Sequence, residues 1–188
     1  MPERIVREIE VLIPAILHLI RDGWTITTLS PVPHRDAELR CQDRQRVEAA
    51  LREAGVDPGA ITFVRQGPDI VAERDQTVWR VECKGAGNGK RSTQRNNFDR
   101  ALGSTVSCFK PPPEGWTLRL GLAVPDHPDY LTNLRERVSK LLRTTLNLWV
   151  LLVTEHGIEM TRPADEGQWG SPGRQRRAPY WKALGLDR

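Results

Sequence analysis

The sequence predicts an α/β fold in which a mixed central sheet is flanked by helices. One observation is the stretch 67–84, which alternates polar and apolar side chains as the strands of a half-buried hairpin do. A second is a pair of runs, 118–124 (LRLGLAV) and 148–153 (LWVLLV), that are apolar almost throughout, as in strands buried on both faces. A helical pattern at 129–145 separates these runs, so a right-handed crossover makes them a parallel pair.

Three elements are expected before the hairpin. Residues 3–22 predict a helix, because apolar residues recur at helical spacing and Gly23 is typical of the position after a helix end. Pro14 should remove one of its hydrogen bonds and kink it. Residues 24–29 (WTITTL) are rich in β-branched side chains and predict the first strand. Residues 36–54 predict a charged helix whose arginines are mostly solvated or paired with nearby acids.

The hairpin follows a strand expected at 61–65 (ITFVR). Side chains on a strand alternate between its two faces, so Glu82 and Lys84 share a face with Arg80. The other face is apolar and belongs in the core: Trp79, Val81 and Cys83. Asp69 lies on the first strand of the hairpin. The turn is expected at Glu73, Arg74, Asp75 and Gln76.

Two amphipathic helices are expected after the hairpin. Residues 92–109 would begin with Ser92 as N-cap and carry Gln94 in the first turn. The inward stripe of this helix is predicted to be Phe98, Ala101, Leu102, Thr105 and Phe109. The inward stripe of the helix at 129–145 is predicted to be Leu131, Leu134, Val138, Leu141 and Leu142.

The polar end of the hairpin predicts a metal site. Asp69 and Glu82 supply two carboxylates, and Mg²⁺ is a hard cation that takes one or two carboxylates with waters and a phosphate. The backbone carbonyl of Cys83 is a candidate third ligand, and Mn²⁺ is expected to substitute for Mg²⁺. Such an ion lowers the pKa of a bound water and stabilises negative charge in the transition state. Lys84 would position the attacking water or help to deprotonate it.

The motif Pro68-Asp69 followed by Glu82-x-Lys84 resembles the PD-(D/E)xK nuclease superfamily, whose fold occurs in many restriction endonucleases and in archaeal Holliday-junction resolvases. The resemblance covers roughly residues 5–153, at the level of fold and motif. It implies a restriction endonuclease-like αβββαβ core. It also implies an N-terminal helix that bears a further glutamate, and a later helix that opens with a glutamine.

Both supporting residues have candidates in this chain. Gln94 is similar to the glutamine of the family, which helps to hold the site or the water. Glu8 and Glu10 both border the apolar stripe of the first helix. Glu8 is favoured because it lies in line with Leu12 and Leu19 along that stripe, although an ordinary solvated charge is the alternative for either glutamate.

Basic residues near the site and in the tail are candidate contacts to nucleic acid. The loop GAGNGKRS after Lys84 either follows a phosphate backbone or is a plain connection. The C-terminal tail mixes arginines with aromatic residues, which suits phosphate neutralisation and base stacking, although docking on its own domain or on a partner subunit is the alternative. The predicted contacts are Lys90, Arg91, Arg95, Arg174, Arg176 and Arg177.

Length and composition are compatible with these expectations. The 188 residues suggest a nuclease-like domain at 1–160, with a helical insertion at about 35–55, and a basic tail at 161–188. A net charge of +4 permits a phosphate-backbone partner. Three cysteines without CxxC spacing argue against a disulfide framework or a zinc site and favour the cytoplasm. The apolar run at 11–20 is too short to cross a membrane.

The expected function is Mg²⁺-dependent hydrolysis of DNA phosphodiester bonds, in DNA repair, recombination or anti-phage and restriction-type defence. One catalytic centre cuts one strand, so double-strand cleavage implies a homodimer or a larger complex. The alternative is a non-catalytic nucleic-acid-binding or assembly subunit that keeps the fold. A nuclease directed at RNA is a further alternative.

Overall fold

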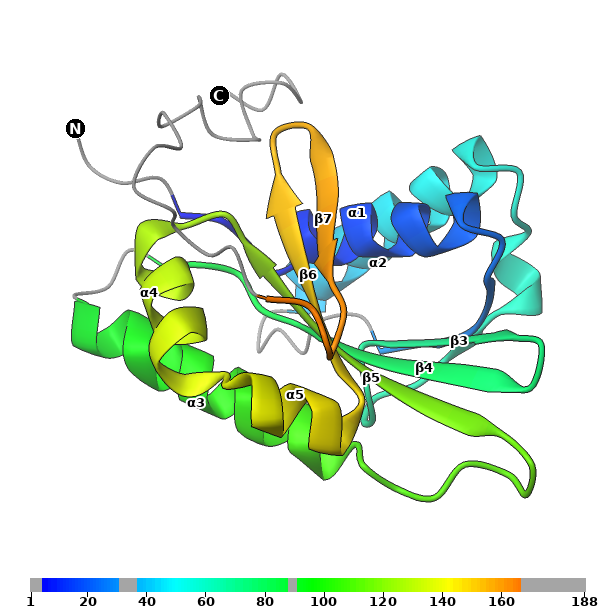
Figure 1. The fold of residues 1–188 in the computed structure, drawn as a ribbon. Coiled ribbons are helices and arrows are strands. Elements are labelled where there is room, and N and C mark those ends of the chain that lie inside the picture. The colour runs from blue at the N-terminus through cyan, green and yellow to red at the C-terminus, as the bar shows by residue number, and fades with distance from the viewer. Residues whose placement is uncertain (1–4, 31–36, 88–90, 167–188) are drawn as a thin grey trace.

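The computed structural model describes residues 5–30, 37–87 and 91–166 (Figure 1). The helices in these ranges are α1 (Ile9–Arg21), α2 (Ala37–Glu53), the 3-10 helix η1 (Pro58–Ala60), α3 (Arg91–Ser107), α4 (Pro128–Arg137) and α5 (Lys140–Leu146). The strands are β1 (Thr25–Leu29), β2 (Thr62–Phe63), β3 (Ile70–Arg74), β4 (Thr77–Cys83), β5 (Thr117–Pro125), β6 (Leu148–Thr154) and β7 (Gly157–Thr161).

The strands form one mixed sheet in the order β2-β1-β3-β4-β5-β6-β7. Strands β1, β3 and β4 are antiparallel neighbours, while β4, β5 and β6 run parallel and β7 returns antiparallel. The connection from β4 to β5 contains α3, and that from β5 to β6 contains α4 and α5. The predicted parallel pair after the hairpin is therefore confirmed.

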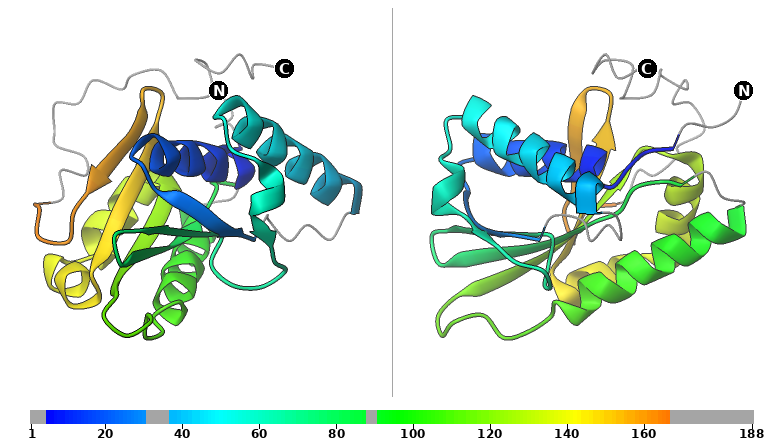
Figure 2. Two further views of the ribbon diagram at one scale, coloured as in Figure 1. Left: turned by 90° about the vertical axis from the view of Figure 1, so that its right-hand side faces the viewer. Right: turned by 180° about the vertical axis from the view of Figure 1, so that it is seen from behind.

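Helices cover both faces of the sheet. Helices α1 and α2 lie on one face, and α3, α4 and α5 lie on the other (Figures 1 and 2). The predicted α/β class with a mixed sheet flanked by helices is confirmed. Over the described residues, no helix combines the length and the apolar character needed to cross a membrane.

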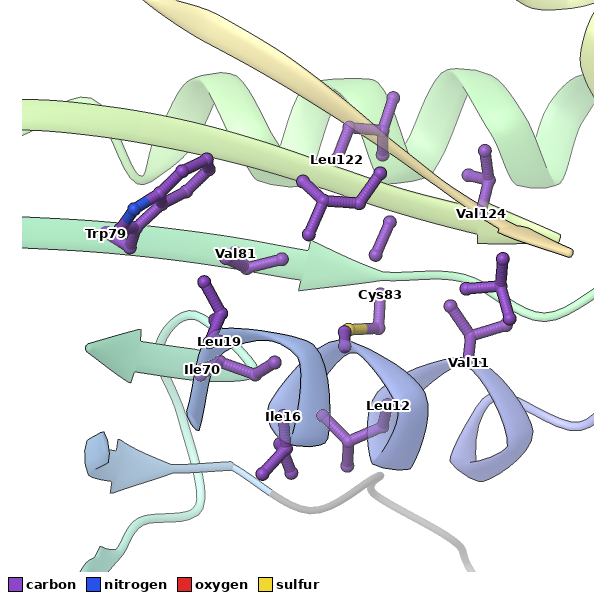
Figure 3. Close-up of a cluster of buried hydrophobic side chains, with 14 of the residues drawn as sticks. Val11, Leu12, Ile16, Leu19, Ile70, Trp79, Val81, Cys83, Leu122 and Val124 are labelled. Atoms are coloured by element: carbon purple, nitrogen blue, oxygen red, sulfur yellow. The ribbon is translucent and has the colours of Figure 1, made fainter. Parts of the chain in front are cut away.

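The hairpin of β3 and β4 is the centre of the sheet. Its turn is shorter than the four residues predicted, because Asp75 and Gln76 both adopt left-handed backbone angles (φ 47° and 56°) that match a two-residue hairpin turn. The predicted alternation along β4 is confirmed. Trp79, Val81 and Cys83 are buried and pack toward α1, beside Leu12, Ile16 and Leu19 (Figure 3).

The predicted single helix at 129–145 was wrong, because α4 and α5 are separate helices. Oγ of Ser139 accepts a hydrogen bond of 3.1 Å from the amide of Leu142, so this serine caps a new helix start. The break changes which side chains face inward. Leu134 and Val138 are buried as predicted, but Leu141 is 76% exposed.

Several predicted boundaries also differ. The first helix begins at Ile9, because Val6 forms an isolated bridge with Ala86. Ser92 lies inside α3 and is therefore not its N-cap, and Phe109 lies beyond the helix end and is 55% exposed rather than inward. The strand predicted at 61–65 contains two residues, Thr62 and Phe63.

Helix α2 is present at the place where the sequence predicted a charged helix, although one of its acids is buried. Asp43 is 1% exposed and accepts two hydrogen bonds of 2.8 Å from the guanidinium of Arg7. This ion pair joins α2 to the segment just before α1. Lys90, Arg174, Arg176 and Arg177, with residues 167–188 of the tail, lie outside the described residues.

Candidate active site

The sheet brings Asp69 and Glu82 together at one end of β3 and β4. Ile70 pairs with Val81, and the same register continued by one residue places Asp69 beside Glu82. Asp69 is buried, and its Oδ2 accepts a hydrogen bond of 2.7 Å from the amide of Cys83. Burial and the neighbouring charge of Glu82 raise the pKa of Asp69 well above its usual value. The two carboxylates are therefore close enough to repel each other.

Glu82 lies on the polar face of β4. Burial, and then the charge of Glu8, raise the pKa of Glu82 to about 7. The positive charge of Lys84 and a hydrogen bond from Ser104 act in the opposite direction, lowering the pKa. Ser104 belongs to α3, and sequence reasoning missed it because helical periodicity marks inward residues without showing which strand residue they meet.

Lys84 forms an ion pair with the first helix. Its Nζ donates a hydrogen bond to Oε2 of Glu8, the residue just before α1. Glu10 makes a different contact: its Oε2 accepts a hydrogen bond of 2.7 Å from the amide of Arg7. Of the two candidate glutamates, Glu8 is thus the one that lies at the end of β4.

Gly85 makes this approach of Glu8 to Lys84 sterically possible. A Cβ at Gly85 would lie 2.6 Å from the amide nitrogen of Glu8, a distance that real Cβ contacts do not show. The amide of Val6 donates a hydrogen bond of 2.7 Å to the carbonyl of Ala86, which fixes the two segments side by side. On the other side, the hydroxyl of Tyr130 from α4 donates a hydrogen bond of 2.8 Å to the carbonyl of Gly85. Neither contact was predicted.

Gln94 occupies a different place from the one expected of a site residue. It is 2% exposed, and its Nε2 donates a hydrogen bond to the carbonyl of Gly87, three residues beyond Lys84. Its Oε1 is buried without a hydrogen-bond partner among the described residues. These contacts tie Gln94 to the backbone that leaves β4, and a role at the carboxylates stays a prediction.

A depression of about 240 Å³ adjoins Glu82 on the α3 side of the sheet. Its lining residues are Gly67, Pro68, Arg80, Glu82, Ser104, Ser107, Cys108 and Lys110. Arg80 donates hydrogen bonds of 3.0 and 2.7 Å to the carbonyls of Cys108 and Lys110, so it holds the end of α3 against β4. The depression thus has a carboxylate at one side and cationic side chains at another.

Two predicted nucleic-acid contacts line a second depression. Arg91 and Arg95 are exposed on the first turns of α3. A hollow of about 440 Å³ is lined by Arg91, Ser92, Arg95, Asn133 and Glu136. These arginines face α4 rather than Glu82. Whether they bind nucleic acid stays a prediction.

The donor set fits a hard cation with few protein ligands. Among residues 5–30, 37–87 and 91–166, no group of three or more His, Cys, Asp and Glu side chains is arranged to hold a metal ion. The site instead offers the carboxylates of Asp69 and Glu82, and Mg²⁺ uses one or two carboxylates in proteins. Their mutual repulsion would be relieved by a cation between them. The buried thiol of Cys83 points to the core and is not part of this donor set.

Comparison of the chain with models of protein families, with curated proteins and with solved structures gave no match. The function is therefore inferred from the geometry of the hairpin end and of the residues that surround it.

Proposed function

We propose that this protein is a Mg²⁺-dependent endonuclease that hydrolyses DNA phosphodiester bonds and belongs to the PD-(D/E)xK superfamily. One observation carries the proposal. Asp69, just before β3, lies beside Glu82 of β4. Lys84, the residue just after β4, forms an ion pair with Glu8, the residue just before α1. Three acids and one amine from three elements thus surround one strand end.

The order of elements supports a restriction endonuclease-like core. Helix α1, the antiparallel neighbours β1, β3 and β4, helix α3 and the parallel strand β5 follow the αβββαβ order of that fold. Helix α2 and strand β2 are additions between β1 and β3. In this arrangement the motif residues lie at the end of the central hairpin.

The side chains have separate roles in the proposed reaction. Asp69, Glu82 and the carbonyl of Cys83 would hold the cation. When bound, the cation, with Mn²⁺ as a substitute for Mg²⁺, would supply Lewis acidity at the phosphate and would lower the pKa of the attacking water. Lys84 positions that water, and Glu8 orients the amine of Lys84 through their ion pair. The depression beside Glu82, with Arg80 and Lys110, is the place for the phosphate backbone.

Cleavage assays test the proposal. Supercoiled plasmid, linear duplex, single-stranded DNA, branched DNA and RNA are incubated with Mg²⁺ or Mn²⁺, using the wild-type protein and Lys84→Ala. The control is Lys140→Ala, because Lys140 is exposed and pairs with Glu166 away from the site. We expect cleavage of DNA by the wild type and the control, and loss of all cleavage in Lys84→Ala. Equal cleavage by all three proteins, or cleavage restricted to RNA, contradicts the proposal.

A non-catalytic nucleic-acid-binding or assembly subunit is the second candidate, and one observation favours it. Asp69 is 7% exposed and one of its oxygens already accepts the amide of Cys83, as in a purely structural carboxylate. A subunit of this kind would bind DNA equally with and without Mg²⁺ and leave every substrate intact. Sedimentation of the protein with uncut duplex would also show whether a homodimer or a larger complex assembles on DNA, as double-strand cleavage implies.

A further inference from the structure

The two segments that meet at the Glu8–Lys84 ion pair are each held by a buried residue of another helix. On one side, Asp43 of α2 is 1% exposed and accepts two hydrogen bonds from Arg7, the residue before Glu8. On the other side, Tyr130 of α4 is fully buried and donates its hydroxyl to the carbonyl of Gly85, the residue after Lys84. Both contacts thus act on a direct chain neighbour of a residue of the Glu8–Lys84 ion pair.

The two segments also pack closely against each other. Gly85 packs directly against the backbone of Arg7 and Glu8, where a Cβ could not fit. The ring of Tyr130 packs edge to face on Phe98, with centroids 5.7 Å apart, so its hydroxyl is held by packing as well as by the hydrogen bond. Burial and then the charge of Glu8 raise the pKa of Tyr130, which agrees with a position close to that carboxylate.

The contact between Arg7 and Asp43 joins a guanidinium to a buried carboxylate. One nitrogen of Arg7, Nη2, donates to both carboxylate oxygens of Asp43, so this nitrogen is held centrally on the carboxylate. Exposed ion pairs elsewhere on α2, such as Arg44 with Glu48, join neighbouring turns of the same helix. The Asp43–Arg7 pair instead spans 36 residues of sequence and docks α2 on the start of α1. A helix that merely extended the surface would not need such a buried ion pair with the segment before α1.

We propose that Asp43 and Tyr130 are positioning residues of the candidate active site, which hold Glu8 against Lys84 through Arg7 and Gly85. This inference rests on the proposed function. It gives the inserted helix α2 a role in catalysis without contact with the substrate. Loss of either contact should move Glu8 relative to Lys84 and slow the chemical step, because small misplacements of catalytic groups reduce the rate strongly.

Kinetics with conservative variants test the positioning role. Asp43→Asn weakens the pair with Arg7, and Tyr130→Phe removes one hydroxyl while keeping the ring. We expect each to lower kcat on linear duplex DNA by about tenfold, with KM changed by less than about twofold. In a Glu8→Gln background Asp43→Asn should not lower kcat further, because Glu8, the residue on which it acts through Arg7, is already disabled. Glu48→Gln, on the same helix, is the control and should leave kcat unchanged.

An equal loss of kcat in the wild-type and Glu8→Gln backgrounds would show a merely structural effect and overturn the inference.

A second experiment measures stability and does not depend on cleavage activity. Urea unfolding in EDTA is measured for the wild type, Glu8→Gln, Lys84→Met and the double variant, which form a double-mutant cycle. We expect the interaction between the two side chains to change the unfolding equilibrium constant by about fivefold. In Asp43→Asn this coupling should fall below about twofold. If it is unchanged, the inference fails, even where wild-type cleavage supports the proposed function. If the coupling falls but the wild type cleaves nothing, the geometry is supported and the proposed function fails.

Discussion

The amide nitrogen of Cys83 donates a hydrogen bond of 2.7 Å to Oδ2 of Asp69. Cys83 lies between Glu82 and Lys84, so the strand that carries two site residues also orients the third. The thiol of Cys83 is buried in the core on the opposite face of the sheet, and burial raises its pKa well above the usual value. One residue thus anchors β4 in the core through its side chain and aligns Asp69 through its backbone.

Asp69 is expected to combine a structural and a catalytic role, which two substitutions separate. In Asp69→Asn the amide oxygen can still accept from Cys83, and one of two repelling charges is removed, so urea unfolding at pH 8 in EDTA should show no loss of stability. Asp69→Ala leaves the buried amide of Cys83 unpaired and should lose about 1–3 kcal/mol. Both variants should lose DNA cleavage. Cleavage by Asp69→Asn at the wild-type rate would show that the carboxylate holds no cation.

Without a divalent cation, stability should fall as the pH rises from about 5 to about 8. Burial raises the pKa of Glu82 to about 7, and the pKa of Asp69 is raised as well. A carboxyl whose pKa is higher in the folded state binds more protons there, so its stabilising effect is lost as the pH rises through the folded value. Urea unfolding in EDTA measures this slope.

Glu82→Gln is the matched variant for this pH dependence, because it cannot titrate. Its slope between about pH 5 and pH 8 should be smaller than that of the wild type. Mg²⁺ should raise wild-type stability more at pH 8 than at pH 5, since the ion binds the ionised carboxylates. Equal slopes for the wild type and Glu82→Gln in EDTA would contradict the assigned environment of Glu82.

Gly85→Ala and Gly87→Ala should differ sharply although they lie two residues apart. A Cβ at Gly85 would meet the backbone of Arg7 and Glu8, whereas a Cβ at Gly87 would meet nothing within 4 Å. Gly85→Ala should therefore cost about 1–3 kcal/mol and separate Glu8 from Lys84, with loss of cleavage. Gly87→Ala should match the wild type in thermal unfolding and in rate. Similar behaviour of both variants would count against the close packing at Gly85.

Ser104 should tune metal binding through Glu82. Its hydrogen bond lowers the pKa of Glu82, so Ser104→Ala should raise that pKa further and weaken Mg²⁺ or Mn²⁺ binding near pH 7. Calorimetric titrations with metal between about pH 6.5 and pH 8.5 measure the effect, which should shrink at the alkaline end. Ser107→Ala, in the same depression, is the control. A loss of affinity that is independent of pH would point to a different cause.

Local patterns in the sequence were enough to predict most of the fold. The alternation along β4 predicted which side chains enter the core, since a strand has only two faces. The apolar runs of β5 and β6 predicted strands buried on both faces. The hairpin also predicted that Asp69 and Glu82 would gather at its polar end. The register that places Asp69 beside Glu82 was not predicted, because it depends on a turn of two residues rather than four.

Helix boundaries and exposed faces were predicted less well. Leu141 and Phe109 continue an apolar periodicity but are exposed, because Ser139 starts a new helix and α3 ends at Ser107. When a helix ends, or a new helix starts at a capping residue, the side chains that follow no longer lie on the face that the earlier spacing predicts. Periodicity alone does not report such a break.

The amino-acid sequence by itself determined the mixed sheet flanked by helices and the gathering of Asp69 and Glu82 at one end of the hairpin, because these follow from short-range periodicity. Only the tertiary structure decided that Glu8 rather than Glu10 meets Lys84, and that Ser104, Tyr130 and Asp43 contact Glu82, Gly85 and Arg7, respectively. These residues come from four helices or their ends, separated from the hairpin by long stretches of chain. Which of them touch depends on how whole helices dock, a property that no local pattern encodes.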